Sequence, residues 1–258
     1  MESLNEEIVV ERNAEYGIIL EKSYTLDLAY EHLKNKKNVT NLIKTLNPIW
    51  GEHILYFDYL NKPFVIVSAK GSSVAVNAVE RIKRTGGKFI TLIGTCGSTD
   101  ESISDGTYIL AKAGVRDEGA SVGYLDMRCP ALANEELTSA ISRELQKAGI
   151  HPRCGVAFTT DKRYREDADL LKFLFSHLGV EYVDMETSAV ILVATYYQIK
   201  VSALKIVTDC AIKETSGQLK GIFDRSKDFV SFVNPKLLNS LDATMDAYMR
   251  INDGSDCE

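Results

Sequence analysis

The chain has 258 residues, 45% of them hydrophobic, and a formal net charge of -6 at pH 7. No composition shift and no linker rich in Pro, Gly or Ser divides it, so we predict a single domain over residues 1–258. The negative charge, and the absence of a Lys/Arg run on any predicted helix face, argue against nucleic acid or a membrane as the main partner. A small molecule is the expected ligand.

The N-terminal segment and the cysteines favour a cytoplasmic protein. Met1 to Glu7 are acidic and lack the apolar core of a secretion signal, and no apolar run approaches the ~20 residues that span a bilayer. The five cysteines show no CxxC spacing and the four histidines form no cluster, so we expect neither disulfides nor a metal site. The acidic tail, about 252–258, is expected to be frayed.

Strand and helix patterns alternate in the first part of the chain. They predict a strand over Tyr16–Leu20, a helix over Leu26–Leu33, strands over Ile54–Tyr59 and Phe64–Ser68, a helix over Val74–Thr85 and a strand over Phe89–Ile93. A strand, a helix and a further strand within about 30 residues are typical of a parallel βαβ unit.

The alternation continues toward the C-terminus. We predict a strand over Tyr108–Lys112, an irregular stretch over Gly114–Pro130, a helix from the N-cap Asn134 to Gly149, a strand over Val156–Thr160, a helix over Asp167–Leu178, a strand over Val180–Asp184, a helix over Thr187–Tyr197, a strand over Ser202–Thr208, and helices over Asp228–Val233 and Lys236–Tyr248 separated at Asn234-Pro235. Strands that are almost continuously apolar indicate a mainly parallel sheet covered on both faces.

Polar residues follow four of these strands, where ligands gather in such folds. They are Gly94 to Gly97, Thr160-Asp161, Asp184 to Glu186, and Asp209. Asp184 and Glu186 are two residues apart, so an extended backbone points both carboxylates to one side, where they could bind a polyol that gains positive charge. The alternative is that both acids only cap the following helix.

Two of the other three stretches also allow two interpretations. Backbone N–H groups of Gly94 to Gly97, with the Thr95 hydroxyl, could cradle an oxyanion, although two glycines can equally mark a tight turn. Asp209 could protonate a heterocyclic nitrogen, or it could be an ordinary acid at a strand end.

Together, five motifs resemble the purine nucleoside phosphorylase and uridine phosphorylase family. They are Ile93 to Gly97, Arg116 to Ser121, Thr159 to Asp161, Val183 to Ala189 and Val207 to Asp209, and the resemblance covers roughly Phe64 to Asp209. It implies a three-layer α/β/α fold around a mixed, partly barrel-like sheet. It also implies a homo-oligomer (hexamer, trimer or dimer) that needs no cofactor and cleaves a nucleoside N-glycosidic bond reversibly, with phosphate as co-substrate.

The resemblance also implies roles for individual residues. Glu186 would hold the ribose 2′- and 3′-hydroxyls, with Met185 under the sugar and Asp184 beside the diol. Thr95 and Gly97 would meet phosphate and base.

The base side of the implied site favours a purine. Asp209 stands where purine-cleaving members place the acid that protonates N7, and Thr160 lies at a neighbouring strand end. Arg163 and Tyr164 occupy the place of an aromatic pair over the base; Tyr164 can stack, and Arg163 could stack or grip a polar substituent.

The phosphate side departs from the family pattern. Thr25 and Leu92 stand where two phosphate-binding arginines are usual, and no arginine lies between Arg12 and Arg81 to supply a third. Each lost charged hydrogen bond would cost about 1.5–3 kcal/mol, which Lys22 or Lys70 could offset in part.

We therefore predict a nucleoside-cleaving enzyme, with two alternatives to phosphorolysis. One is a nucleoside hydrolase in which Glu21, otherwise a solvated loop acid, positions a water molecule. The other is a catalytically inactive nucleoside-binding protein, because a fold does not guarantee a chemistry.

Overall fold

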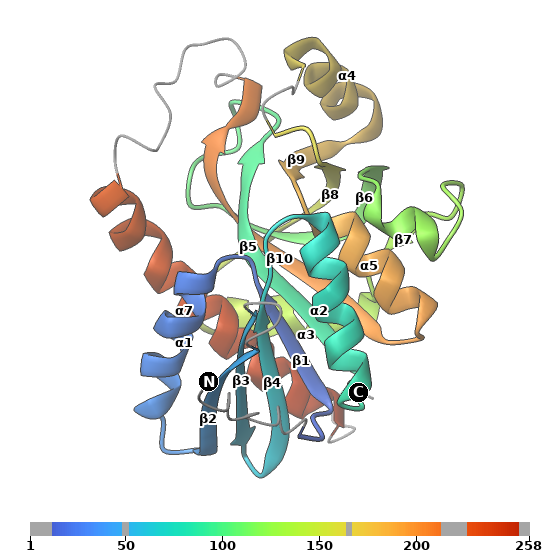
Figure 1. The fold of residues 1–258 in the computed structure, drawn as a ribbon. Coiled ribbons are helices and arrows are strands. Elements are labelled where there is room, and N and C mark those ends of the chain that lie inside the picture. Colours follow the sequence, from blue (N-terminus) through green and yellow to red (C-terminus); the bar gives the residue numbers. More distant parts are fainter. Residues whose placement is uncertain (1–11, 48–51, 164–166, 213–225, 253–258) are drawn as a thin grey trace, which may run out of the picture.

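The fold is built on one mixed sheet that closes on itself at one end (Figure 1). The computed structural model describes residues 12–47, 52–163, 167–212 and 226–252. The strands are β1 (Tyr16–Leu20), β2 (Val39–Asn47), β3 (Glu52–Tyr59), β4 (Lys62–Ser68), β5 (Phe89–Ser98), β6 (Tyr108–Asp117), β7 (Ala131–Leu132), β8 (Arg153–Thr160), β9 (Val180–Asp184) and β10 (Lys200–Cys210).

The closed part of the sheet is a ring of strands. The sheet order is β10-β6-β8-β9-β5-β1-β4-β3-β2, and β10 also pairs in parallel with β5, which joins β5, β9, β8, β6 and β10 into a barrel-like ring. On the open side β1, β4 and β5 are parallel, whereas β2, β3 and β4 are antiparallel. The expected mixed, partly barrel-like sheet is confirmed.

Helices cover both faces of the open sheet, so the molecule has three layers (Figure 1). On one face lie α1 (Ser23–Lys34), α3 (Glu135–Lys147) and α7 (Ser226–Asn252); on the other lie α2 (Ser72–Arg84) and α5 (Thr187–Tyr196). Side chains of β1 alternate between these layers, with Ile18 and Leu20 in the first core and Ile19 in the second. A strand buried on both sides explains the continuous apolar run.

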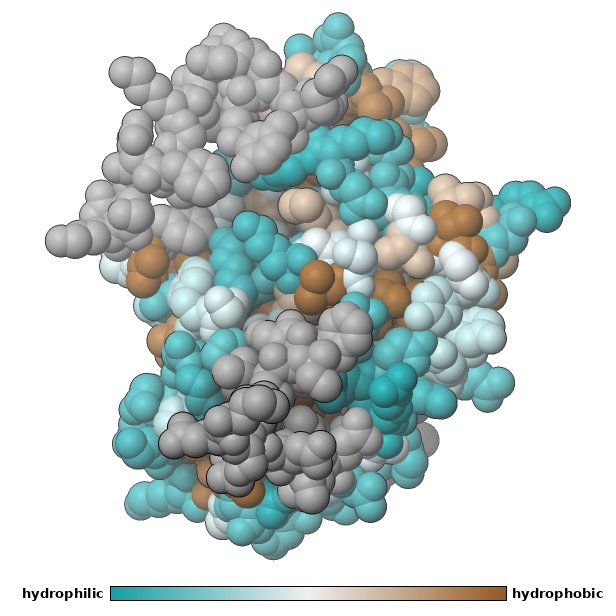
Figure 2. Space-filling view, viewed as in Figure 1, coloured by the Kyte–Doolittle hydropathy of each residue, from teal (hydrophilic) through white to brown (hydrophobic). Residues whose placement is uncertain are grey.

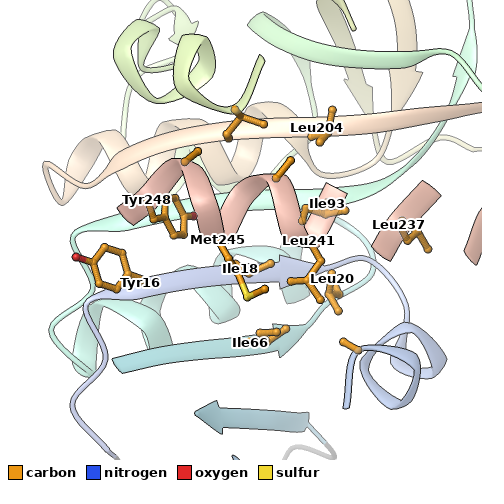
Figure 3. Close-up of a cluster of buried hydrophobic side chains, with 14 of the residues drawn as sticks. Tyr16, Ile18, Leu20, Ile66, Ile93, Leu204, Leu237, Leu241, Met245 and Tyr248 are labelled. Carbon is orange, nitrogen blue, oxygen red and sulfur yellow. The ribbon is translucent and has the colours of Figure 1, made fainter. Parts of the chain in front are cut away.

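The long helix α7 closes the first core against β1 and β5 (Figure 3). Leu241, Met245 and Tyr248 pack onto Ile18 and its neighbours. The Tyr248 ring stacks on Tyr16 with 5.5 Å between ring centroids. Because burial of such large side chains dominates folding energetics, this layer anchors the strands that carry the site.

The sequence placed most elements correctly, including two helix starts. Asn134 caps α3 by accepting a hydrogen bond from the Leu137 N–H at 2.9 Å. Asp167 caps α4 (Ala168–Leu178) by accepting from the N–H groups of Asp169 and Leu170. Gly179 then ends α4 in the left-handed conformation that glycine tolerates best.

Three predictions of local structure were wrong. No strand was predicted where β2 lies, an edge strand that is defined by its pairing with β3 and interrupted by a bulge between Thr40 and Ile43. The segment predicted to be irregular from Gly114 continues β6 as far as Asp117, because the ring supplies β8 as a partner, and a short 3-10 helix, η1 (Ala120–Gly123), follows.

The third wrong prediction concerns Pro235, which does not separate two helices but lies inside α7. Val233 and Leu237, on either side of it, are both buried in the first core. Burial of this continuous face outweighs the roughly 3 kcal/mol that an interior proline costs. Asn252 is the last residue of α7, and the rest of the predicted frayed tail lies outside the described residues.

Most of the visible surface is hydrophilic, and hydrophobic residues gather over α4 at the top of the view (Figure 2). There Leu170, Phe173 and Leu178 are exposed. None of the helices in the described ranges is both long and apolar enough to cross a membrane.

We predict that Tyr248→Phe lowers the free energy of unfolding by about 1–2 kcal/mol. The buried Tyr248 hydroxyl donates to the Gly17 carbonyl oxygen at 2.8 Å and lies 2.8 Å from Thr91 Oγ1. Phenylalanine keeps the ring stacking but leaves these groups without that partner. Urea denaturation measures the effect, with the exposed Tyr196→Phe as control; equal stability of both variants would contradict it.

Candidate active site

The predicted site residues lie at or near the ends of four strands, and three of these strands, β1, β9 and β10, pair with the fourth, β5. Glu21 follows β1, Thr95 and Gly97 lie on β5, and Asp209 lies on β10. Gly97 is paired with Val183 of β9 on one side and with Asp209 on the other. The segment Asp184 to Glu186, which leaves β9, therefore lies beside the ends of β5 and β10.

Asp184 is a buried anchor between three elements. Its Oδ1 accepts a hydrogen bond from the Thr159 hydroxyl at 2.8 Å. Its Oδ2 accepts from the N–H and the hydroxyl of Thr187 at the start of α5, at 3.1 and 2.5 Å. Asp184 therefore does cap α5, as the alternative interpretation of the sequence proposed, because its carboxylate accepts from a free N–H of the first turn.

Glu186 occupies the N-cap position of α5, but its side chain makes no capping hydrogen bond to that helix. Its Oε1 accepts from the Gly71 N–H at 2.7 Å, just before α2 begins. Gly71 has φ +84°, a conformation that favours glycine, so this donor depends on the residue type. Glu186 is 1% exposed, and burial raises its pKa to about 7 against the opposing effect of the Lys205 ammonium group.

A lysine that the motifs did not include lies between the carboxylates. Lys205 of β10 is fully buried, and its Nζ lies 2.9 Å from Asp184 Oδ2, 3.1 Å from Glu186 Oε2 and 3.9 Å from Glu21 Oε2. Burial alone would lower the Lys205 pKa, but these acids raise it well above the usual value. One feature of the sequence could have revealed this lysine: it is the single charged residue in the apolar run of β10, four residues before Asp209. A lysine buried in a strand needs acidic partners, so this position indicates a buried ion pair.

Glu21 lies within hydrogen-bonding distance of both donors of Thr95, in the Gly94-to-Gly97 segment. Its carboxylate accepts from the Thr95 backbone N–H, and the Thr95 hydroxyl lies 3.2 Å from Glu21 Oε2. Any Cβ at Gly94 would collide with the Glu21 side chain, so the glycine allows this close approach. Lys22 Nζ lies 3.4 Å from Thr95 Oγ1 on the same side.

Asp209 lies at the far end of the same group of strands, and is 8% exposed. The Thr208 hydroxyl lies 2.8 Å from Asp209 Oδ1 and 3.3 Å from the Cys96 carbonyl oxygen. A Cβ at Gly97 would lie 3.2 Å from the Ala211 side chain, so little space remains on that side of β5. The Thr208 hydroxyl thus contacts both the Asp209 side chain and the backbone of β5.

Three of the remaining predicted residues lie at the end of β8 or on the loops that follow β8 and β9. The buried Thr160 hydroxyl donates to Asp117 at 2.8 Å, and the Lys162 ammonium group joins the same carboxylate at 3.0 Å. Met185 and Arg163 are partly exposed on the loops that follow β9 and β8. Tyr164 lies outside the described residues.

The motif from Arg116 to Ser121 fixes the loop that follows β6. The Arg116 guanidinium donates to main-chain carbonyl oxygens of Leu125, Asp126 and Cys129. Buried Glu118 accepts from the Ser121 N–H at 2.9 Å and from the Ser188 hydroxyl at 3.2 Å. These contacts tie the loop to α5 and so support the position of Glu186.

The two residues at the family's arginine positions have other contacts. The Thr25 hydroxyl donates to the Lys22 carbonyl oxygen at 2.5 Å, and Leu92 is fully buried in the core beneath α2 and α5. Within the described ranges, no group of three or more His, Cys, Asp or Glu residues is arranged to hold a metal ion, and Cys96, Cys129, Cys154 and Cys210 are free thiols. The cation among the central carboxylates is the Lys205 ammonium group itself.

Comparison with known proteins gives a family match over most of the chain. The family model described as Phosphorylase superfamily matches residues 16–233. Uridine phosphorylase of Haemophilus influenzae is 30% identical over 154 residues, which are 53% of this chain and 60% of that protein, so the match spans less than two thirds of that relative. A DeoD-type purine nucleoside phosphorylase of Thermoanaerobacter sp. (strain X514) is 27% identical over 65% of this chain and 72% of its own.

Solved structures show the same fold at low sequence identity. Uridine phosphorylase from Vibrio fischeri ES114 superposes with a TM-score of 0.75 at 22% identity, covering 91% of each chain. AMP nucleosidase from Bacteroides thetaiotaomicron gives a TM-score of 0.71 at 21% identity, covering 94% of this chain and 91% of its own.

We predict that Glu186 makes the protein less stable as the pH rises. Its pKa is about 7 in the folded protein against 4.5 unfolded, so its stabilisation is complete below pH 4.5 and lost as the pH passes 7. Between pH 4.5 and 8 the free energy of unfolding of the wild type should fall by roughly 3 kcal/mol relative to that of Glu186→Gln. Denaturant titrations at each pH test this, with the surface variant Glu136→Gln as control; parallel curves for wild type and Glu186→Gln would refute it.

Proposed function

The chain belongs to the phosphorylase superfamily, and from this premise we propose that it hydrolyses the N-glycosidic bond of a purine nucleoside, with water as the nucleophile. The products are the free base and ribose. One observation carries the choice of nucleophile: the Glu21 carboxylate accepts from the Thr95 N–H and lies within hydrogen-bonding distance of the Thr95 hydroxyl, the donors that could otherwise cradle phosphate.

Electrostatics also favours water over phosphate at this position. A phosphate dianion at Thr95 would lie next to Glu21, and two like unit charges about 4 Å apart repel by about 4 kcal/mol at an effective dielectric constant of about 20. Thr25 and Leu92 stand where the resemblance places arginines, and neither carries a guanidinium group that could compensate. The Thr25 hydroxyl donates to a backbone carbonyl oxygen, and Leu92 lies in the core. A neutral water molecule escapes this penalty and can donate to the Glu21 carboxylate.

The sugar is proposed to bind at Glu186. An ionised carboxylate offers about four lone-pair sites, and the Gly71 N–H and the Lys205 ammonium group use two of those on Glu186. Acceptor capacity therefore remains for the 2′- and 3′-hydroxyls of ribose. As the glycosidic bond breaks, the ring gains cationic character, and the nearby negative charge stabilises that transition state.

Asp209 is proposed to act on the base. In its protonated form it donates its proton to the departing purine nitrogen, while water adds its hydroxide to C1′ and its proton to Glu21. The proton then returns from Glu21 to Asp209 through solvent, so the enzyme is regenerated. The sum of these steps is nucleoside plus water to purine base plus ribose.

Phosphorolysis is the second candidate, and Lys22 is the observation that favours it. Its Nζ lies 3.4 Å from Thr95 Oγ1 and could attract an anion to the same donors. A lysine is a point charge without the bidentate geometry of arginine, so it replaces the missing arginines only in part.

A nucleoside panel with and without phosphate tests the proposal. Adenosine, inosine, guanosine and uridine are incubated with the protein in phosphate-free buffer, and free base, ribose and ribose 1-phosphate are quantified. We expect purine release as base and ribose at a rate that added phosphate does not raise. Release that requires phosphate and gives ribose 1-phosphate would select phosphorolysis, and saturable binding without release would select a binding protein.

Glu21→Gln should lower the hydrolytic kcat by about 10²- to 10⁴-fold, the usual contribution of a general base. The amide keeps the shape of the side chain but accepts no proton from water. Glu31→Gln, on the exposed face of α1, is the matched control and should retain wild-type kcat. An active Glu21→Gln variant with wild-type kcat would reject Glu21 as the residue that activates water.

Glu186→Ala and Asp209→Ala should each reduce turnover by orders of magnitude without unfolding the protein. Removing Glu186 withdraws the charge beside the sugar, and removing Asp209 withdraws the proton for the base. Steady-state kinetics measures the loss, and circular dichroism confirms the fold. Turnover close to wild type in both variants would refute this assignment of the site.

A further inference from the structure

We propose that Lys205 is a positioning residue for the reaction, whose ammonium group keeps Glu186 charged and holds Glu186 and Glu21 in place for the sugar and the water. This inference rests on the proposed function. It assigns a role to a residue that belongs to none of the five motifs.

Lys205 is the shared partner of the central carboxylates. Its Nζ forms ion pairs with Asp184 at 2.9 Å and Glu186 at 3.1 Å, and lies 3.9 Å from Glu21. The ammonium group has three N–H donors and is out of contact with solvent. Because the three acids come from the ends of β1 and β9, one cation on β10 links three strands at the site.

Each carboxylate also has a second anchor, so its orientation is defined from two sides. Asp184 accepts from Thr159 and Thr187, Glu186 accepts from the Gly71 N–H, and Glu21 accepts from the Thr95 N–H. For Glu186 and Glu21 these anchors leave acceptor sites that a ligand can use. Lys205 thus fixes both acids without saturating them.

Charge makes the lysine necessary for chemistry as well as for packing. The carboxylates around Lys205 repel one another, and burial raises the pKa of Glu186 to about 7 even with Lys205 present. A protonated Glu186 loses both an acceptor site and the negative charge that a cationic sugar requires. The titratable groups that act on Glu186 are Lys205 of β10, Glu21 after β1 and Asp184 of β9. Around these partners lie Cys96 on β5, Tyr182 on β9 and Asp209 on β10.

A purely structural lysine and a positioning lysine predict different results. Loss of a structural ion pair lowers stability and reduces activity equally at every pH. Loss of the cation that keeps Glu186 ionised moves the acid limb of the pH–rate profile, because kcat/KM reports the ionisation of the free enzyme. The pH profile therefore separates the two roles.

The first test compares pH profiles of kcat/KM for the wild type, Lys205→Met, Lys205→Arg and the control Lys200→Met. Lys200 lies on the same strand but pairs with Glu136 at the surface. We expect the acid limb of Lys205→Met to move up by about one pH unit or more, as for loss of an opposite charge within hydrogen-bonding distance. Lys205→Arg should stay within about half a unit of the wild type and Lys200→Met should match it. Coincident acid limbs in Lys205→Met and the wild type would overturn the proposal.

A second test needs no turnover and guards against a poorly folded single variant. Glu21→Gln/Lys205→Met removes one carboxylate together with the lysine, so the cluster keeps the net charge that it has in the wild type. The Glu186 carboxyl is titrated by ¹³C NMR, assigned with Glu186→Gln, in this double variant and in Glu21→Gln. We expect its midpoint to lie about one pH unit or more higher in the double variant. Equal midpoints would overturn the proposal.

The two proposals fail separately. Base release that depends on phosphate would reject hydrolysis, whereas a shifted Glu186 midpoint would still establish the role of Lys205. Hydrolysis independent of phosphate, combined with an unshifted midpoint and acid limb, would reject Lys205 alone.

Discussion

The site depends on a buried ion cluster in which one lysine holds three acids. Taking a charge out of water costs several kcal/mol, and the cost is recovered only when partners and hydrogen bonds surround it. Lys205 meets this condition with Asp184 and Glu186, which in turn accept from Thr159 and Gly71. Removing Lys205 would leave these acids without their shared cation, so the local backbone, the charge state and the shape of the site are coupled.

The ring of strands makes such a cluster possible. β5 and β10 run in parallel from the open sheet into the ring, and β9 pairs with β5 only at Gly97 and Ser98. The ends of β9 and β10 therefore lie on either side of the same β5 residues. Helices α1, α3 and α7 on one face, and α2 and α5 on the other, bury β5 and β10 in the open sheet, and Lys205 itself is fully buried.

The chemistry proposed for the site follows from where its charges lie. In the arrangement that the family resemblance implies, cations around Gly94 to Gly97 would hold a phosphate ion. In this chain a carboxylate takes the Thr95 N–H, and the nearest buried cation, Lys205, is already paired with acids. The part of the site proposed for the sugar has the expected acids, whereas the part proposed for the nucleophile carries the Glu21 carboxylate where the resemblance implies anion-binding groups. Water as nucleophile is consistent with that difference.

The sequence alone was sufficient for the elements with strong local signals: the alternating apolar runs, the Asn134 cap, and acids such as Glu186 and Asp209 at strand ends. It could not reveal β2, the end of β6 or the continuity of α7 through Pro235, because pairing and burial against distant segments stabilise them. Nor could it show that Lys205 and Glu21 meet. The two residues are far apart in the chain. A lysine within an apolar strand indicates that an acidic partner exists, but it does not identify that partner. The register of β1, β5, β9 and β10 determines which acids lie next to the lysine.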